Sequence, residues 1–467
     1  MKRILNIETI NKINSRVKLA GWVNTRRNMG KIIFIDLRDK SGLIQVVFVP
    51  QELDQASQEA IKKIRPEYVI EIEGLVNQRP KNQTNKNLKT GAVEILAKSL
   101  IILNQSKTPP FEIDNETLRA NEELRLKYRY LDLRHKRMKN NIILRHQIIK
   151  TIRNYLDQVG FLEIETPILT KGTPEGAREF IVPSRLYPNK FYVLPQAPQQ
   201  FKQLLMVAGI EKYFQIARCF RDEDTRGDRQ PEFTQLDMEM SFISQNDILD
   251  LVENLAIEIV KKATPDKKIS VIPFPRLTFK EVMKKYQTDK PDLRKNKNNP
   301  NELAFCFITD FPLFKYSEKE KKNVSIHHPF TSPRAEDIPL LNKNPLKVIA
   351  RQYDFVCNGL EIAGGSIRIH QRDIQEKIFQ ILKITKKEIQ RQFGHMLEAF
   401  EYGAPPHGGI AWGLDRLVML LANEPNIREI IAFPKTAEQK DLMMGSPSEI
   451  PKEQLLEANI RSIRNKE

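Results

Sequence analysis

Residues 213–242 constrain the fold of this chain more than any other stretch. In the segment FTQLDMEMSF, residues 233–242, five mostly apolar residues alternate with five more polar residues. The more apolar set is Thr234, Leu236, Met238, Met240 and Phe242, and the other set is Phe233, Gln235, Asp237, Glu239 and Ser241. A period of two over ten residues predicts a β-strand with one apolar and one largely polar face. YFQIARCF before it predicts the antiparallel partner, joined through the charged loop 224–230.

The polar face of this hairpin has two interpretations. Antiparallel sheets commonly leave one face in water, so a solvated surface is the plain alternative. However, the face and its loop combine arginines, carboxylates and amides, including Arg221 and Glu223, which favours a binding site. The strings FRDED and RQPEFTQLDMEMSF also resemble the second signature motif of class II aminoacyl-tRNA synthetases, and most closely that of the bacterial aspartyl-tRNA synthetases.

Composition sets the outer limits. A chain of 467 residues is expected to form two or three domains. It has no apolar run near the ~18 residues of a membrane span and no signal-peptide pattern at its start, so we expect no membrane and a cytoplasmic location. Its three cysteines form no CxxC pair, which argues against a disulfide framework or a zinc ribbon. The net charge of +16 favours a polyanionic partner.

Residues 1–103 predict a small β-barrel of the OB type, because five short strand patterns surround one helical insert at 51–64. This segment holds 18 Lys and Arg against 10 Asp and Glu. A hairpin closed at Asp39 and Gly42 would pair Asp36 with Gln45 and Phe34 with Val47. Phe34 would then lie on the outer face, where aromatic rings stack unpaired bases; the alternative is that it packs under the loop 78–90.

GWVNTRRNMGKIIFIDLRD resembles the anticodon-binding barrel of aspartyl-tRNA synthetases. The resemblance implies that four residues hold the tRNA anticodon loop: Arg26, Arg27, Phe34 and Gln45.

Residues 104–135 resemble the hinge of the same family, with charge alternating with Leu and Tyr at helical spacing after two prolines. From Lys136 a long amphipathic helix is expected, ending at Gly160, with a buried stripe of Ile142, Ile143, Ile149, Ile152 and Leu156. GFLEIETPILT then predicts a strand broken at Pro167. Together these resemble the first class II motif, which implies a homodimer.

The resemblance also implies an amino-acid pocket. Lys202 falls on the first turn of the expected helix QQFKQLLMVAG, where the macrodipole disfavours a cation, so we expect an anion beside it. In SIRIH, Arg368 belongs on a polar strand face. His327 and His328 are adjacent and cannot easily share one metal. The residues that the family assigns to aspartate are Glu175, Gln199, Lys202, Arg221, Asp237, His327, His328 and Arg368.

GGIAWGLDRLVMLLA resembles the third class II motif, and Arg416 near the start of its helix would bind a phosphate. Arg221 and Arg416 are the expected catalytic residues, and Asp354 with Glu361 are the expected Mg²⁺ ligands. The ATP-binding residues implied are Arg221, Asp222, Glu223, Gln230, Phe233, Glu361, Gly413, Leu414, Asp415 and Arg416.

The resemblance therefore implies an α+β chain: an OB-fold barrel at 1–103, a hinge at 104–135, a class II catalytic domain with an antiparallel sheet flanked by helices at 136–444, and a tail at 445–467. The insertion domain of bacterial members is expected to be missing after YQTDKPDLR, where a short loop at 295–301 stands. The expected cofactors are ATP and Mg²⁺.

The expected reaction is ATP-dependent activation of L-aspartate and its transfer to tRNA(Asp), with tRNA(Asn) left open as a second acceptor. The alternatives are an asparaginyl-tRNA synthetase and a non-catalytic RNA-binding paralogue. A free-standing amide synthetase on the same catalytic fold is opposed by the basic barrel. No P-loop or GxGxxG motif points to another class of nucleotide enzyme.

Overall fold

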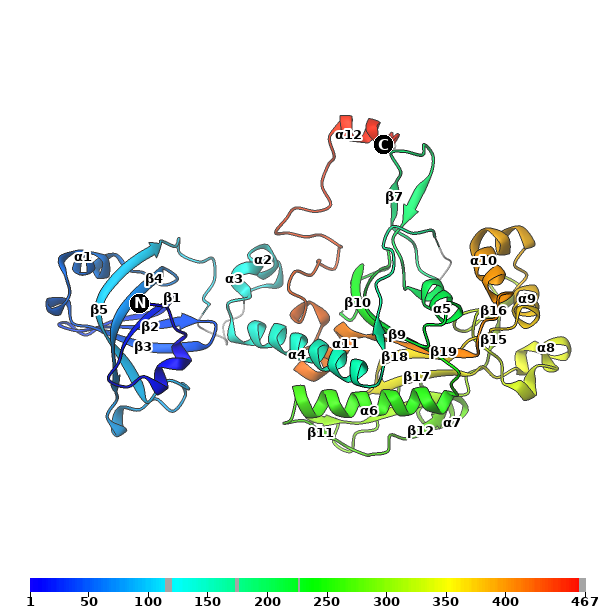
Figure 1. Ribbon diagram of the computed structural model, residues 1–467, viewed down its shortest axis with the longest axis horizontal. Helices are drawn as coiled ribbons and strands as arrows, with labels where there is room; N and C mark the ends of the chain where they lie inside the picture. The colour runs from blue at the N-terminus through cyan, green and yellow to red at the C-terminus, as the bar shows by residue number, and fades with distance from the viewer. Residues whose placement is uncertain (114–119, 173–175, 226, 462–467) are drawn as a thin grey trace. The chain divides into compact units, whose positions relative to one another are not determined.

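The computed structural model describes residues 1–113, 120–172, 176–225 and 227–461. The chain divides into two compact units, Met1–Lys136 and Arg137–Glu467. Figure 1 shows a barrel in the first unit and a sheet with flanking helices in the second. The predicted hinge at 104–135 falls within the first unit, and the limits predicted for the four segments stay predictions.

The first unit contains a closed five-stranded barrel of strand order β1-β2-β3-β5-β4, which confirms the predicted OB fold. Its interior is filled by alternating apolar residues such as Leu19, Ile35 and Ile72, all buried. The elements are β1 (Arg16–Asn28), β2 (Ile33–Asp39), β3 (Gly42–Phe48), α1 (Gln55–Lys63), β4 (Val69–Gln78) and β5 (Val93–Asn104).

The register of β2 and β3 follows the predicted hairpin. Asp39 pairs with Gly42, Asp36 with Gln45, and Phe34 with Val47. Because the pattern alternates, Ile33 and Ile35 fill the barrel while Phe34 and Asp36 lie on its outside.

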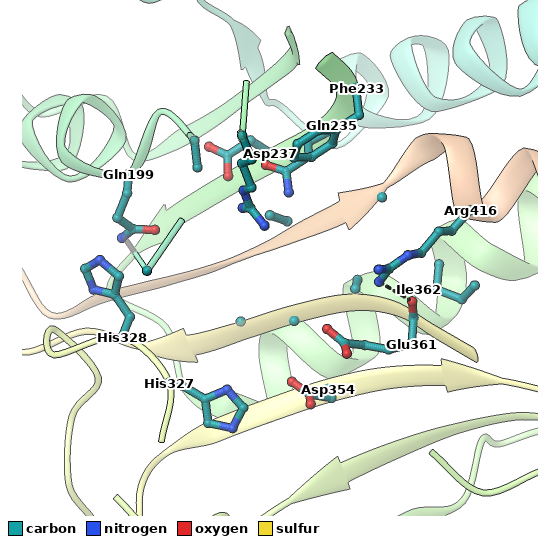
Figure 2. Close-up of a pocket in the computed structure, with 18 of the residues that line it drawn as sticks. Gln199, Phe233, Gln235, Asp237, His327, His328, Asp354, Glu361, Ile362 and Arg416 are labelled. Atoms are coloured by element: carbon teal, nitrogen blue, oxygen red, sulfur yellow. Dashed lines mark hydrogen bonds between the residues drawn. The ribbon is translucent and has the colours of Figure 1, made fainter. Parts of the chain in front are cut away.

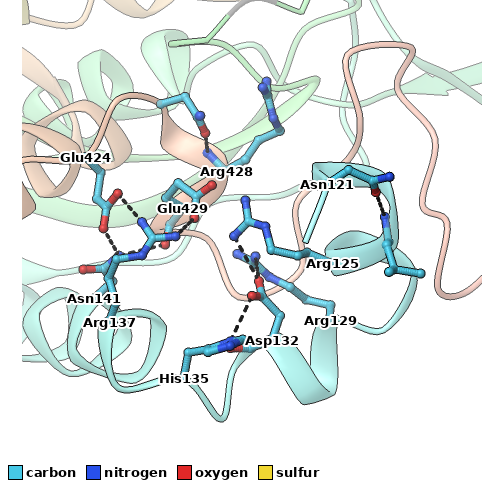
Figure 3. Close-up of polar contacts among 12 residues, drawn as sticks. Asn121, Arg125, Arg129, Asp132, His135, Arg137, Asn141, Glu424, Arg428 and Glu429 are labelled. Carbon is cyan, nitrogen blue, oxygen red and sulfur yellow. Dashed lines mark hydrogen bonds and ion pairs between the residues drawn. The ribbon is translucent and has the colours of Figure 1, made fainter. Parts of the chain in front are cut away.

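The segment after the barrel is helical, as its spacing predicts, in α2 (Glu122–Lys127) and α3 (Arg129–Asp132). Asp132 is buried there against Arg129 at 2.5 Å, Arg125 at 3.5 Å and the His135 ring at 3.3 Å (Figure 3). Hydrogen bonding to His135 and the two guanidinium charges outweigh burial and lower the pKa of Asp132.

The second unit is built on an eight-stranded sheet of order β12-β14-β17-β18-β19-β10-β9-β6. The central strands are antiparallel, as predicted, but β6 joins β9 and β12 joins β14 in parallel, so the sheet is mixed. The strands are β6 (Leu162–Glu163), β9 (Lys212–Phe220), β10 (Glu232–Ser241), β12 (Arg276–Thr278), β14 (Phe305–Thr309), β17 (Gln352–Cys357), β18 (Leu360–Ile367) and β19 (His407–Gly413).

Helices α4, α6 and α11 share one apolar core with the sheet, which includes Ile152, Leu255, Met238 and Val418. Helix α5 contributes charged and amide side chains to the pocket described below. The larger helices are α4 (Lys136–Gln158), α5 (Gln199–Val207), α6 (Gln245–Ala263), α7 (Phe279–Tyr286), α9 (Arg372–Ile381), α10 (Lys386–Phe400) and α11 (Leu414–Ala422).

Short elements complete the unit. Three two-stranded ribbons lie outside the main sheet, and two further short helices are present among the described residues. They are β7 (Ile181–Pro183) with β8 (Phe191–Val193), β11 (Lys268–Ile269) with β13 (Glu302–Leu303), β15 (Phe314–Ser317) with β16 (Lys322–Ser325), α8 (Leu340–Lys343) and α12 (Lys452–Glu457).

The β9–β10 hairpin confirms the opening prediction, with Leu236 paired to Ile216 and Asp237 to Gln215. The alternation fails at its last residue, because β10 ends at Ser241 and Phe242 turns out with φ 58° and 68% of its surface exposed. The polar face is not solvated either: Asp237 and Glu239 are fully buried.

The predicted stripe of α4 is partly wrong. Ile152 and Leu156 are buried, but Ile148 lies in the core and Ile143 is 43% exposed. Side chains five residues apart on an α-helix point in directions that differ by roughly 140°. Ile143 and Ile148 therefore cannot lie on the same face of α4. The strand expected at 161–170 is likewise reduced to the two residues of β6.

A buried amide extends the inner face of α4 toward its start. Asn141 donates to Glu424 at 2.8 Å and to the carbonyl of Glu429 at 3.1 Å, and Arg137 pairs with Glu429 at 2.6 Å (Figure 3). These contacts join α4 to the segment that follows α11. Among the described residues no helix is both long and apolar enough to cross a membrane.

Candidate active site

A pocket of about 720 Å³ lies over the polar face of the sheet in the second unit. Figure 2 shows side chains entering it from the strands and from the loop that carries His327 and His328. The predicted residues that line it are Gln199, Lys202, Arg221, Glu223, Gln230, Phe233, Asp237, His327, His328, Asp354, Glu361, Arg368, Gly413, Asp415 and Arg416.

Two predicted residues that the structure describes are not among those lining the pocket. Leu414 is fully buried in the apolar core on the other side of the sheet, and Asp222 lies near the surface with Arg178 at 3.6 Å. Glu175 lies outside the described residues, so its predicted contact with the substrate stays a prediction.

One end of the pocket holds a buried set of alternating charges. The Lys202 ammonium lies 2.6 Å from Asp237 and 3.3 Å from Glu239, and its side chain is 1% exposed. The anion expected beside this lysine is therefore present, supplied by β10. Three buried ions that pair with one another avoid much of the desolvation cost that each alone would carry.

Arg368 extends this charge set. Its Nε and Nη2 donate to the two oxygens of Glu239 at 2.9 and 3.2 Å, and its Nη1 donates to Ser366 at 2.7 Å. The charges of Arg368 and Lys202 outweigh burial and lower the pKa of Glu239. For Asp237 burial dominates, and its pKa is raised.

Glu239 is the residue in this end that sequence reasoning missed. The alternation of residues 233–242 places Glu239 on the polar face and assigns it no role. The sequence feature that corresponds to Glu239 is Gly409, its partner on β19. A Cβ at Gly409 would lie 2.0 Å from the Glu239 carboxylate, so only glycine leaves room for it. The glycine pair in GGIAWG thus makes room for a buried acid.

The two adjacent histidines point to different neighbours. The ring of His327 meets Phe311 edge-on at 4.8 Å, whereas that of His328 lies 4.9 Å from Phe330. Figure 2 shows the two rings directed to separate parts of the pocket. Burial lowers the pKa of His328 to about 3, so its ring is neutral.

The other end of the pocket carries more accessible charges. The Arg221 guanidinium lies 5.1 Å from the centre of the Phe233 ring, and its buried Nε has no hydrogen-bond partner among the described residues. Arg416 pairs with Asp228 at 3.0 Å and donates to the Glu361 carbonyl at 3.3 Å. Glu223 pairs with Arg229 at 2.9 Å.

Two predicted ATP residues are held by the protein itself. Asp415 accepts from Arg145 and from the Thr234 amide, which fixes α11 against β10. Gln230 donates to the Lys435 carbonyl at 3.0 Å and accepts from its amide at 2.8 Å. Their polar groups shape the pocket wall.

Asp354 and Glu361 lie on the β17–β18 hairpin, on facing strands. Burial and the nearby Glu361 raise the pKa of Asp354 to about 8. Glu361 pairs with Lys290 at 2.7 Å, a cation that the sequence did not single out. Two carboxylates in a pocket that also holds Arg221 and Arg416 fit Mg²⁺, which takes one or two carboxylates together with substrate phosphates. Among the described residues no group of three or more metal-ligating side chains was found.

On the barrel, three of the four predicted anticodon residues, Arg27, Phe34 and Gln45, adjoin one another. The Arg27 guanidinium lies 5.8 Å from the centre of the Phe34 ring, and it donates to Gln45 at 3.2 Å. The Nε of Arg26 is buried without a hydrogen-bond partner among the described residues. The outer face of β1–β3 thus presents the Phe34 ring, the Arg27 guanidinium and the Gln45 amide, whereas Arg26 pairs across the strands with Ile35, whose side chain fills the barrel.

Comparison with known families accounts for both units. The model for class II tRNA synthetases (D, K and N) matches residues 121–437, and that for the OB-fold nucleic acid binding domain matches residues 17–103. An aspartate–tRNA(Asp/Asn) ligase of Rubrobacter xylanophilus is 44% identical over 96% of this chain and 94% of its own. An aspartate–tRNA ligase of Geobacillus kaustophilus is 42% identical over 96% of each chain.

A third relative, the aspartate–tRNA(Asp/Asn) ligase of Syntrophomonas wolfei, is 43% identical over the full length of both chains. That alignment runs over 591 residues, whereas this chain has 467, so the relative contains residues without a counterpart here. Their predicted place, after Arg294, stays a prediction.

Solved structures share the fold. The asparaginyl-tRNA synthetase of Pyrococcus horikoshii, complexed with asparaginyl-adenylate, superposes with a TM-score of 0.75 at 23% identity, covering 93% of this chain and 98% of its own. The aspartyl-tRNA synthetase of Entamoeba histolytica gives a TM-score of 0.72 at 22% identity, covering 93% and 91%. From the family match and its near-full-length relatives, the chain belongs to the class II tRNA synthetases of the D, K and N group.

Proposed function

We propose that this protein is an aspartate–tRNA ligase, which activates L-aspartate with ATP and transfers it to the 3′ end of tRNA(Asp). The observation that carries the proposal is the buried set of Lys202, Arg368, Asp237 and Glu239 at one end of a pocket that has Arg221 and Arg416 at the other. The relatives, 42 to 44% identical, bear the same activity in their names.

Charge pairing supports aspartate as the substrate. Beyond its bonds to Glu239 and Ser366, Arg368 keeps one N–H on each of Nη1 and Nη2, and these with the Lys202 ammonium suit a side-chain carboxylate. Asp237 suits the substrate ammonium. An asparagine amide would leave a cation less well paired, and a lysine ammonium would be repelled. A site built on such polar pairing rejects analogues by factors of about 10⁴ or more.

The first step follows from the same placement. The substrate α-carboxylate is ionised at neutral pH, so its attack on the α-phosphorus of ATP requires no general base. It requires two anions to be brought together in line, and Arg221 would neutralise both while Phe233 stacks on adenine. Arg416 would hold the terminal phosphate of the leaving pyrophosphate.

Asp354 and Glu361 would hold Mg²⁺. When bound, the ion supplies positive charge to the phosphate oxygens. Lys290 pairs with one oxygen of Glu361 at 2.7 Å and would compete with the ion for this carboxylate.

We propose that the barrel holds the anticodon through Phe34, Arg26, Arg27 and Gln45. The names of several relatives include both tRNA(Asp) and tRNA(Asn), which supports tRNA(Asn) as a second acceptor. Met29 and Gly30, in the loop between β1 and β2, lie where the third anticodon base would be read.

We also propose a homodimer. The first class II motif region leaves several apolar side chains in water in the single chain, and burial against a second copy would remove that exposure. They are Ile143, Leu162, Ile168 and Leu169.

Aminoacylation of purified tRNA(Asp) and tRNA(Asn) with aspartate and with asparagine tests the function. We expect charging of tRNA(Asp) with aspartate and none with asparagine. Charging of tRNA(Asn) with asparagine would make the chain an asparaginyl-tRNA synthetase, and no charging by any pair would support a non-catalytic RNA-binding protein.

A further inference from the structure

A line of three buried side chains leads from the first residue of the interior strand β19 into the pocket. His407 begins β19, Gln203 lies on α5, and Gln199 lies one turn earlier on α5. The ring Nε2 of His407 is 3.1 Å from the Gln203 amide nitrogen, and the Gln203 amide oxygen is 3.0 Å from the Gln199 amide nitrogen. His407 and Gln203 are fully buried, and Gln199 extends into the pocket (Figure 2).

The hydrogen bond between His407 and the Pro405 carbonyl determines which group donates in every other hydrogen bond of this line. His407 Nδ1 is 2.7 Å from the carbonyl oxygen of Pro405, which can only accept, so Nδ1 must carry the proton. Burial lowers the pKa of His407, and a neutral ring with its proton on Nδ1 has an acceptor at Nε2. Gln203 must therefore turn its NH₂ toward the histidine.

The rest of the line is then determined. Because the Gln203 NH₂ donates to His407, the Gln203 oxygen faces Gln199. The Gln199 NH₂ must therefore donate to that oxygen. The Gln199 oxygen is left for the pocket, where it has no hydrogen-bond partner among the described residues. The orientation of an amide usually has to be assigned from its network, and here the network begins at a backbone carbonyl.

A second acceptor in the same pocket also lacks a partner. Asp237 accepts from Lys202 through Oδ1. The Tyr213 hydroxyl lies near this carboxylate but donates to Gln215 at 2.9 Å, so the fully buried Oδ2 of Asp237 is left without a hydrogen bond among the described residues. A buried acceptor without a donor is costly, so this oxygen calls for a ligand that donates. The Gln199 oxygen and Asp237 Oδ2 together suit an ammonium group.

We infer that His407 and Gln203 are positioning residues that hold the Gln199 amide with its oxygen toward the substrate α-ammonium. The inference rests on the proposed activation of aspartate and adds residues that do not touch the substrate. Without Gln203, the Gln199 amide would be free to turn its NH₂ toward the ammonium, which would replace an attraction with a repulsion.

The test compares Gln203→Met with Gln200→Met. Both glutamines are buried on α5, but Gln200 lines a separate cavity of about 70 Å³. Aspartate-dependent exchange between ATP and pyrophosphate gives KM and kcat, and succinate, which is aspartate without its ammonium, gives an inhibition constant on the same protein.

For Gln203→Met we expect the KM for aspartate to rise roughly tenfold to hundredfold, the loss of one hydrogen bond to a charged group. We expect kcat within twofold of the parent and an unchanged inhibition constant for succinate. Gln200→Met should leave all three values unchanged. An unchanged KM in Gln203→Met, or an equal rise in the succinate constant, would overturn the inference.

A measurement on the parent chain keeps the inference testable if Gln203→Met does not fold. The chain has seven histidines, so nitrogen NMR of its imidazoles can identify the His407 signal by its loss in His407→Gln. We expect the neutral form with the proton on Nδ1; a proton on Nε2 at neutral pH would contradict it. If the parent shows no aspartate-dependent exchange, the proposed function fails instead.

Discussion

The two ends of the pocket hold charge in different ways. At the end that we propose binds the amino acid, Lys202, Arg368 and Glu239 are almost fully buried and paired with one another. At the end that we propose binds the nucleotide, Arg416 and Glu361 pair with partly exposed partners, Asp228 and Lys290. The first end is therefore preorganised, whereas the second holds its charges in pairs that a ligand can displace.

This difference assigns separate tasks. Buried, mutually fixed ions resist rearrangement, so they can discriminate between a carboxylate and an amide. On the proposed function, the exchangeable pairs at the other end would keep the cations in place until triphosphate and metal bind. Breaking them would cost little, because such exposed pairs stabilise by only about 0–1 kcal/mol.

The largest expected effect is a difference in the free energy of unfolding between a variant at each end of the pocket. Arg368→Met and Arg416→Met should each reduce aspartate-dependent exchange by roughly 10²–10³-fold or more, since each removes a cation from a developing or bound anion. Only Arg368→Met should also lower the free energy of unfolding, by roughly 3–5 kcal/mol, because Glu239 loses its main partner in a buried site. Arg416→Met should lower it by about 1 kcal/mol at most.

Urea unfolding of the two variants beside the parent checks this pair. Equal stability losses at the two positions would remove the distinction between a preorganised and an exchangeable end.

The second effect separates the pocket from the barrel. Phe34→Ala should leave aspartate-dependent exchange unchanged but weaken charging of tRNA, by roughly tenfold or more in KM for tRNA, since a base stacked on an aromatic ring contributes about 1–3 kcal/mol. Lys98→Ala, on β5 beside Glu52, removes a barrel cation as a matched control and should change neither value. Exchange impaired by Phe34→Ala would show that the barrel also affects activation.

The third effect concerns the metal. With its pKa raised to about 8, Asp354 holds a proton below that pH and must lose it to bind Mg²⁺. Mg²⁺ affinity in the presence of ATP should therefore rise by roughly tenfold per pH unit below 8 and level off above it. Asp354→Asn should abolish this pH dependence; calorimetric titration at pH 6, 7 and 8 compares the two proteins. A flat profile in the parent would contradict it.

The smallest effect tests the exchangeable pair directly. Lys290→Met should raise Mg²⁺ affinity by about twofold to fivefold, because the competing pair with Glu361 contributes about 1 kcal/mol or less. Lys295→Met, in the neighbouring loop, controls for the loss of one positive charge. A weaker Mg²⁺ affinity in Lys290→Met would show that the lysine assists binding.

The sequence predicted the elements whose pattern is local. Alternation gave the β9–β10 hairpin and its apolar side, and turn spacing gave the β2–β3 register. The unfavourable place of Lys202 on its helix indicated an anion. The sequence did not show that these anions are Asp237 and Glu239. Alternation identifies the face of a strand on which a residue lies, but not which side chains pack against that face.

The remaining misses have the same cause. Ile143 is apolar yet exposed, and Asn141 is polar yet buried, because contacts with Glu424 and Glu429 decide which side of α4 faces inward. Leu414 falls within the third motif, but its side chain points into the core. Lys290 lies far from Glu361 in sequence, and no local pattern joins them.

Exchange between ATP and pyrophosphate by the parent chain, measured separately with aspartate, asparagine and lysine, tests the central claim most directly. A preorganised set of Lys202, Arg368, Asp237 and Glu239 predicts exchange with aspartate and a preference over asparagine of about 10⁴ or more. Exchange with asparagine at a comparable rate would contradict the claim that these buried ions select a carboxylate.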